Sequence, residues 1–286
     1  MGNLVKTEKQ GSTDHRRPNI VFLVADDHRY DGIRAFGNRA IQTPVLDRLA
    51  ESGVSFTRVH IMGGLVGAVC VPSRAALHTG VNVFRASVSQ TVDDPNGIRT
   101  INPEIAVLPQ VLQEAGYHTY ATGKWHNDIC TFAKSFSSGA RLFFGGMSDH
   151  RNVPLHHFDP SGQYPKEEQY IGDGFSTELF ADAAVDFLQS YRNEAQPYFL
   201  YVAFTSPHDP RTPPKEYADL YDPEAIDLPD NYLSEHPFDN GELQNRDERL
   251  AQWPRTPEVV RRHIADYYGM ISHMDAQIGR IIEALN

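Results

Sequence analysis

Hydrophobic runs without polar interruption mark the strands expected in this chain. Residues 20–25 and 198–204 are hydrophobic at nearly every position, which is typical of strands buried on both faces of a parallel sheet. Shorter strands are expected over 54–59 and 117–121. Each of these runs is followed by polar or turn-forming residues, so the sequence predicts several short strands separated by longer connections.

The connections between these strands carry the periodicity of helices. Apolar positions recur every three or four residues over 44–52, 104–115 and 175–191, and again from Val260 to Leu285. The last face must pack against another part of the protein. Strands that alternate with amphipathic helices predict an α/β fold, with a mostly parallel sheet sandwiched between helices.

Two long stretches, 128–172 and 206–257, lack clear periodicity and are rich in Pro, Gly, Asp and His. Loops of this length inside a compact domain tend to be functional, so we expect substrate specificity to reside in them. The polar residues 1–17 are predicted to form an N-terminal tail, and residues 18–286 one α/β domain.

Charge and cysteine content narrow the possible functions. The 286 residues include 26 Lys and Arg against 37 Asp and Glu, a net charge of −11, which argues against nucleic acid as the main partner. Two cysteines exclude a disulfide scaffold, and Cys130 is expected to be a small buried residue. No apolar stretch reaches the length of a signal peptide or a membrane span, which favours a cytoplasmic location.

Two adjacent carboxylates, Asp26 and Asp27, follow the first predicted strand. Ligands bind at the carboxyl ends of parallel strands, and paired carboxylate oxygens suit a hard cation such as Ca²⁺ or Mg²⁺. Taken alone, the pair is equally compatible with a solvated turn or a helix cap.

A second motif begins at Cys70. Pro72 can start a helix and Gly80 can end it, which places Cys70 at an N-terminus where free amides favour an anion. Arg74 adds a cation one turn further on. This Cys-x-Pro-Ser-Arg run resembles the signature of the type I sulfatases, in the alkaline phosphatase-like superfamily, where a maturation enzyme oxidises the cysteine to formylglycine.

Further motifs occur in the order found in that family. The segment 19–27 resembles its opening strand and first metal ligands, and 43–50 resembles the helix that follows. Gly123-Lys124-Trp125-His126 is similar to a second family element, and the segment 206–210 around His208 resembles its later histidine loop. The resemblance extends over residues 18–286.

The resemblance implies the hydrolysis of a sulfate ester, carried by a small molecule or a carbohydrate, to an alcohol and inorganic sulfate. Oxidised Cys70, hydrated to a geminal diol, attacks sulfur to form a covalent sulfo-enzyme. Asp26 and Asp27 hold a calcium ion, or magnesium, together with the oxidised Cys70. The second hydroxyl of the diol allows sulfate to leave while the aldehyde returns.

Four further residues receive roles from the same resemblance. Arg74 and Lys124 stabilise the negative charge that builds on the transferred group. His208 donates a proton to the departing alcohol, and His126 takes a proton from the second hydroxyl.

The sequence departs from the family at its C-terminal end. The family has a later strand that brings Asp with Asn or His to the metal, and a downstream Lys to the sulfate; this chain ends before it, so the domain is expected to be incomplete. The run Ser148-Asp149-His150 resembles that late element but occurs too early, and we interpret it as coincidence. His78 stands where the family has an apolar residue, and is expected at the pocket rim or in solvent.

Two alternatives stay open. The chain could be a phosphonate or phosphate ester hydrolase of the same superfamily, because tetrahedral anions require similar cations. It could also be a truncated, catalytically silent domain, because half of the metal shell is missing. Neither the identity of the ester nor the oligomeric state can be predicted from the sequence.

Overall fold

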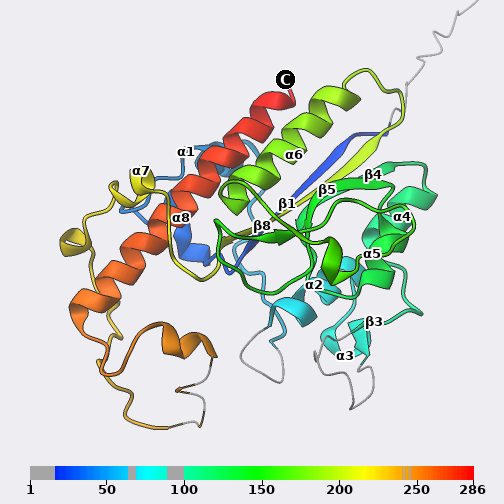
Figure 1. The fold of residues 1–286 in the computed structure, drawn as a ribbon. Coiled ribbons are helices and arrows are strands. Elements are labelled where there is room, and N and C mark those ends of the chain that lie inside the picture. Colours follow the sequence, from blue (N-terminus) through cyan, green and yellow to red (C-terminus); the bar gives the residue numbers. More distant parts are fainter. Residues whose placement is uncertain (1–16, 64–68, 89–99, 240, 242, 245) are drawn as a thin grey trace, which may run out of the picture.

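Four parallel strands form the central sheet of the protein, seen in a computed structural model that describes residues 17–63, 69–88, 100–239, 241, 243–244 and 246–286. In sheet order they are β1 (Ile20–Asp26), β8 (Tyr198–Pro207), β4 (His118–Lys124) and β5 (Ser138–Phe143) (Figure 1). The predicted parallel sheet is thereby confirmed. Of the predicted tail, residues 1–16 lie outside the described residues.

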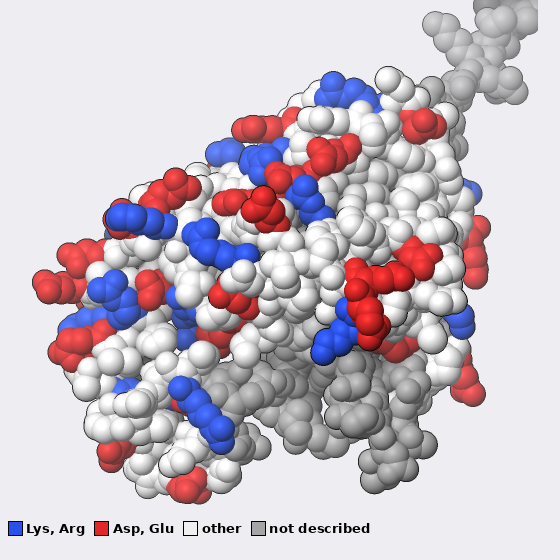
Figure 2. Space-filling model, viewed as in Figure 1, with Lys and Arg blue, Asp and Glu red and all other residues white. Residues whose placement is uncertain are grey.

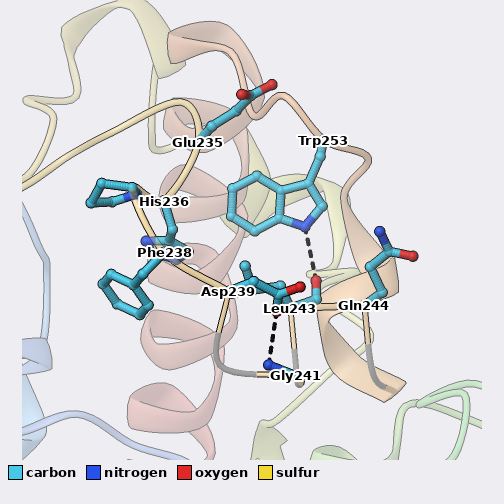
Figure 3. A pocket seen from close by; sticks show the side chains of 9 residues that line it. Glu235, His236, Phe238, Asp239, Gly241, Leu243, Gln244 and Trp253 are labelled. Atoms are coloured by element: carbon cyan, nitrogen blue, oxygen red, sulfur yellow. Dashed lines mark hydrogen bonds between the residues drawn. The ribbon is translucent and has the colours of Figure 1, made fainter.

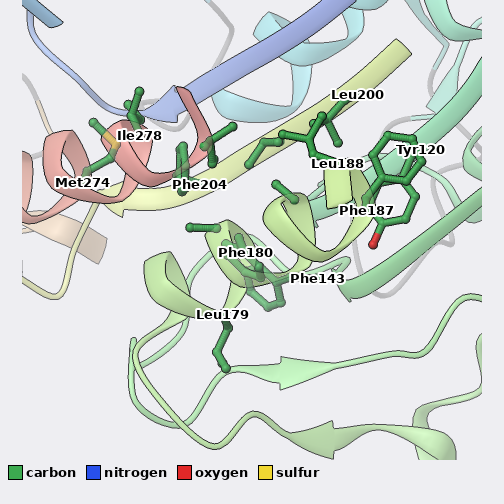
Figure 4. Packing of buried hydrophobic residues seen from close by; sticks show 14 of the residues in the cluster. Tyr120, Phe143, Leu179, Phe180, Phe187, Leu188, Leu200, Phe204, Met274 and Ile278 are labelled. Carbon is green, nitrogen blue, oxygen red and sulfur yellow. The ribbon is translucent and has the colours of Figure 1, made fainter. Parts of the chain in front are cut away.

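One face of the sheet is covered by two long helices that lie side by side, α6 (Ser176–Tyr191) and α8 (Pro257–Ala284) (Figure 1). Figure 4 shows how their apolar side chains meet the sheet and each other: the cluster includes Phe180, Leu188, Leu200, Val202, Phe204, Met274 and Ile278. The apolar face predicted for the C-terminal helix therefore packs against the sheet and α6.

Helix α8 also fixes the start of a third helix, α1 (Pro44–Ser52). The Asp275 carboxylate accepts hydrogen bonds from the amides of Val45 and Leu46, at 3.0 and 2.7 Å. These amides have no partner within their own helix, so the last helix of the chain caps the first.

The opposite face packs against α2 (Cys70–Thr79), α4 (Leu108–Glu114) and α5 (Ile129–Ser135). The buried cluster between them is rich in aromatic rings: Trp125, Phe132, Phe136, Phe199 and Tyr201. Because both faces of the sheet are covered, every residue of β8 is buried, which explains why its sequence is hydrophobic without alternation.

Three predictions about the elements are wrong. Residues 54–59 form no strand; their hydrophobic side chains Val54, Phe56 and Val59 are exposed, and they pair with none of the described strands. The helix predicted over 104–115 begins only at Leu108, after an extended Val107. The stretch 128–172 is not simply a loop, because it contains α5 and the edge strand β5.

Short elements complete the described chain. They are η1 (Tyr30–Gly32), η2 (Arg34–Phe36), α3 (Val83–Ala86), β2 (Ser87–Val88), β3 (Thr100–Ile101), β6 (Pro154–Leu155), η3 (Lys166–Glu168), β7 (Tyr170–Ile171), α7 (Lys215–Ala218), η4 (Pro223–Ala225) and η5 (Arg246–Leu250). The last three are the only elements between β8 and α8 in the described part of 206–257, so that stretch is mostly irregular, as predicted.

On the face seen in Figure 2, Lys and Arg side chains are interspersed with Asp and Glu and form no continuous basic surface. Among the described residues, no helix combines the length and the apolar composition needed to cross a bilayer.

Candidate active site

The candidate site lies where three strands end. Strand β1 ends at Asp26, β4 ends at Lys124, and His208 directly follows β8. The strands are parallel neighbours, and Asp26 is paired in register with Pro207. The carboxyl ends of parallel strands meet at one edge of a sheet, so three residues that are far apart in sequence come together.

At the centre of this edge, three buried charges form an ion cluster. The Lys124 ammonium donates a hydrogen bond to the Asp26 carboxylate, and Arg74 Nη2 lies 3.7 Å from Asp26 Oδ1. Burial alone would raise the pKa of Asp26, but the Arg74 and Lys124 cations outweigh that effect and lower it. Asp26 is therefore ionised, and one carboxylate faces two cations, which leaves an excess positive charge for an anion.

Hydrogen bonds from the two cations to neighbouring groups hold them in place. Arg74 Nη1 donates to the main-chain oxygen of Lys124 at 2.6 Å and to the hydroxyl of Tyr201 at 3.2 Å. Lys124 also donates to the carbonyl of Gly146. Neither Tyr201 nor Gly146 is marked by a signal in the sequence, because one lies in a hydrophobic strand and the other is one of 21 glycines.

Cys70 is the first residue of α2, a ten-residue helix whose N-cap residue provides no side-chain cap. The thiol is half-buried and lies close to the ring of His208. Burial raises the pKa of Cys70, but its interaction with His208 and the charge of Lys124 outweigh that effect, so the thiol pKa is lowered. The same interaction raises the pKa of His208. Each partner therefore favours the charged form of the other.

His126 lies two residues after Lys124 and has a backbone φ of 54°. Its Nδ1 is buried and has no hydrogen-bond partner among the described residues. Burial, followed by the charges of Lys124 and Arg74, lowers the pKa of His126 to about 3. The ring is therefore neutral at neutral pH and has a lone pair that can accept a proton.

Asp27 adds a second carboxylate beside the ion cluster. Its backbone has a φ of 63°, which is uncommon outside glycine, and the Tyr267 hydroxyl donates to its carbonyl at 2.7 Å. Although the residue is exposed, reduced hydration raises the pKa of its carboxyl, and the Asp209 and Asp26 carboxylates add to this effect.

A divalent cation would relieve the repulsion that Asp27 experiences, and the two carboxylates have the oxygen chemistry that calcium prefers. Among the described residues, however, no cluster of three or more His, Cys, Asp or Glu side chains has the arrangement of a metal site. Asp26 and Asp27 thus fit part of a calcium shell, which takes about six to eight oxygens.

Two other residues differ from their predictions. His78 is neither at a pocket rim nor in solvent: its ring is buried, with centroids 4.6 Å from Trp125 and 5.1 Å from Tyr201. Burial lowers its pKa to about 3, so it serves as a neutral core side chain. Cys130 is exposed rather than buried, because it lies on the outer side of the short helix α5.

A separate hollow is found in the irregular stretch 206–257 (Figure 3). It is lined by Glu235, His236, Phe238, Asp239 and Trp253, among others, and by none of the predicted site residues. The Trp253 indole donates to the carbonyl of Leu243 at 2.9 Å.

Comparison with known proteins gives the family. The profile of the sulfatase family matches residues 18–286. The chain belongs to the sulfatase family. An arylsulfatase of Clostridium perfringens is 27% identical over an alignment 298 positions long, which covers 94% of this chain and 60% of that protein. The first curated relatives are matched over 55–63% of their own length.

Solved structures share the fold. A sulfatase structure from Bacteroides fragilis superposes with a TM-score of 0.71 at 24% identity, over 99% of this chain and 60% of that one. A second structure, of a protein in complex with its substrate D-glucosamine-2-N,6-O-disulfate, has a TM-score of 0.71 at 21% identity, over 94% of this chain and 62% of that one.

Proposed function

We propose that the protein hydrolyses sulfate esters at the edge of the sheet where Asp26, Cys70 and Lys124 meet. The observation that carries this proposal is the convergence of all the motif residues there, from four separate segments of the chain. Membership of the sulfatase family supports the class of reaction.

The two cations and two histidines have distinct tasks in this proposal. Lys124 and Arg74 bind the oxygens of the sulfate group, since Asp26 neutralises only one of their two charges. His208, the residue that follows β8, donates a proton to the departing alcohol. His126 is neutral and accepts a proton; a bound anion beside Lys124 would raise its low pKa toward a useful value.

The proposal also includes a modified side chain at position 70 and a divalent cation. Oxidation of Cys70 to formylglycine by a maturation enzyme would supply a hydrated aldehyde, whose hydroxyl is the nucleophile. Asp26 and Asp27 would hold Ca²⁺, or Mg²⁺, with the oxidised Cys70, and this ion would add positive charge where sulfate binds. The residues themselves orient the ester and move its protons.

The substrate we propose is a sulfate ester of a carbohydrate or an aryl alcohol. A related fold has been solved with a disulfated glucosamine as its substrate, and a relative in sequence is an arylsulfatase.

The first test measures turnover of the full chain produced together with a formylglycine-generating enzyme. We expect release of sulfate from 4-nitrophenyl sulfate, and a much lower rate with 4-nitrophenyl phenylphosphonate, the matched phosphonate ester. Peptide mass spectrometry should show a loss of about 18 mass units at Cys70, as the conversion of thiol to aldehyde requires. A large preference for the phosphonate, or an unmodified thiol in active protein, would contradict the proposal.

A second test concerns the room around His126. A Cβ atom added at Gly146 would lie 2.5 Å from His126 Nε2, so the ring must move. We expect Gly146→Ala to lower kcat about 10- to 100-fold, because a displacement of about 1 Å can cost that much, with little change in folding stability. Steady-state kinetics with 4-nitrophenyl sulfate measure this change in kcat.

The adjacent glycine provides the matched control. A Cβ atom at Gly145 would collide instead with the ring of Phe143, at 2.7 Å. Gly145→Ala should therefore affect stability more than kcat. If both variants lose the same activity, His126 has no special role.

A further inference from the structure

His150 contacts the main chain of His208, but it is not one of the residues of the sulfatase motifs. The side chain is buried, and its ring is stacked on Phe175 with centroids 5.1 Å apart and planes within 3°. Its main-chain carbonyl accepts a hydrogen bond from the amide of Ser176, the first residue of α6, at 2.7 Å. His150 therefore connects the segment 144–175, which lies between β5 and α6, to the start of α6.

Both ring nitrogens of His150 are occupied. Nε2 is 3.0 Å from the carbonyl oxygen of His208, and Nδ1 is 2.9 Å from the hydroxyl of Ser176. A carbonyl oxygen only accepts, so Nε2 carries the proton. Burial lowers the pKa of the ring, which makes it neutral, so Nδ1 accepts from the hydroxyl. This tautomer satisfies the contacts with His208 and Ser176, and the Thr205 hydroxyl lies 3.3 Å from the same Nδ1.

The carbonyl that His150 holds belongs to the residue proposed as the proton donor. The main chain of His208 is also held by its amide, which donates to the carbonyl of Thr205 at 3.1 Å. The ring of His208 has one nitrogen, Nδ1, 3.1 Å from the carbonyl of Asp209. With the backbone held on both sides, the remaining freedom of His208 is small, and its ring lies close to Cys70.

We propose that His150 is a positioning residue that holds the main chain of His208, so that its ring stays aligned with the alcohol leaving the sulfate. This inference rests on the proposed function. It assigns a role to the motif Ser148-Asp149-His150, which has the appearance of a metal-binding element but places its histidine in the core.

The test compares two substitutions of His150 on two esters. His150→Leu keeps the volume and removes both hydrogen bonds, whereas His150→Gln can still donate to the His208 carbonyl and accept from Ser176. The esters are 4-nitrophenyl sulfate, whose alcohol leaves readily without a proton, and phenyl sulfate, whose alcohol is far more basic and depends on proton donation.

We expect His150→Leu to lower kcat about 100-fold for phenyl sulfate and less than about 10-fold for 4-nitrophenyl sulfate, with KM changed little. His150→Gln should recover most of the loss. The control is His156→Leu. His156 is a buried histidine of the same segment, 144–175, and packs on Phe144 and Tyr164. This substitution should lower kcat for both esters equally or for neither.

Equal loss on the two esters, or no rescue by Gln, would overturn the inference. Amide hydrogen exchange tests the same contact without turnover: His150→Leu should speed exchange within residues 205–211 while His156→Leu does not, and unchanged exchange in that segment would also overturn it. If the unsubstituted protein hydrolyses neither ester, the proposed function fails, and the exchange measurement still decides whether His150 holds this segment.

Discussion

Replacement of Cys70 by alanine is expected to abolish hydrolysis of sulfate esters. The side chain at this position lies at a helix N-terminus, beside both Lys124 and His208. Loss of a nucleophile in other hydrolases costs roughly three to six orders of magnitude in kcat. We expect Cys70→Ala to lower kcat with 4-nitrophenyl sulfate at least about 1000-fold. Both proteins are produced together with the maturation enzyme for this comparison.

Cys130 offers a matched control in the same chain. It is an exposed cysteine outside the site, so Cys130→Ala should keep its activity and its formylglycine content. The unfolding midpoints of both variants should stay close to that of the unsubstituted protein, because neither removes a large buried side chain. Turnover close to normal in Cys70→Ala would mean that another group attacks sulfur.

The positions of the site residues follow from features visible in the sequence. Asp26 and His208 each come at or just after the end of a hydrophobic run, and parallel strands bring such positions to one edge. Cys70 precedes a proline in the first turn of its helix and a glycine that ends it. These signals are local, and the expectation that the motif residues lie near one another comes from combining them with the resemblance to the sulfatase motifs.

The contacts among those residues could not be predicted. The pairing of Lys124 with Asp26 depends on β4 and β1 lying on either side of β8, and strand order is not visible in a single sequence. The role of Tyr201 as acceptor for Arg74 is hidden for a similar reason, because β8 is buried on both faces and has no polar alternation to mark it.

The wrong predictions of secondary structure have physical reasons. Residues 54–59 are rich in the β-branched and aromatic side chains that favour strands, but no described strand pairs with them, and a strand requires partners more than propensity. Strand β5 is hard to predict because Ser138–Phe143 contains a glycine, an alanine and an arginine. It lies at the edge of the sheet, where pairing with β4 on one side suffices.

The largest effect on folding is expected at Gly123, within the motif of Lys124 and His126. Its backbone φ is +89°, and it is paired with Ala203 of the central strand. A Cβ atom here would lie 2.0 Å from the carbonyl oxygen of Ala203, a main-chain atom that cannot move without separating β4 from β8. Gly123→Ala should therefore destabilise the protein by about 3–5 kcal/mol, combining left-handed strain with overpacking.

Gly116 separates these two contributions. Its φ is +88°, almost the same, but the nearest atom to an added Cβ is the end of the flexible Arg17 side chain, 3.4 Å away. Gly116→Ala should thus cost only the backbone strain, about 1–2 kcal/mol. Urea unfolding followed by circular dichroism gives both values. If the two substitutions cost the same, the close approach of β8 does not explain the glycine that precedes Lys124, and backbone strain alone accounts for both losses.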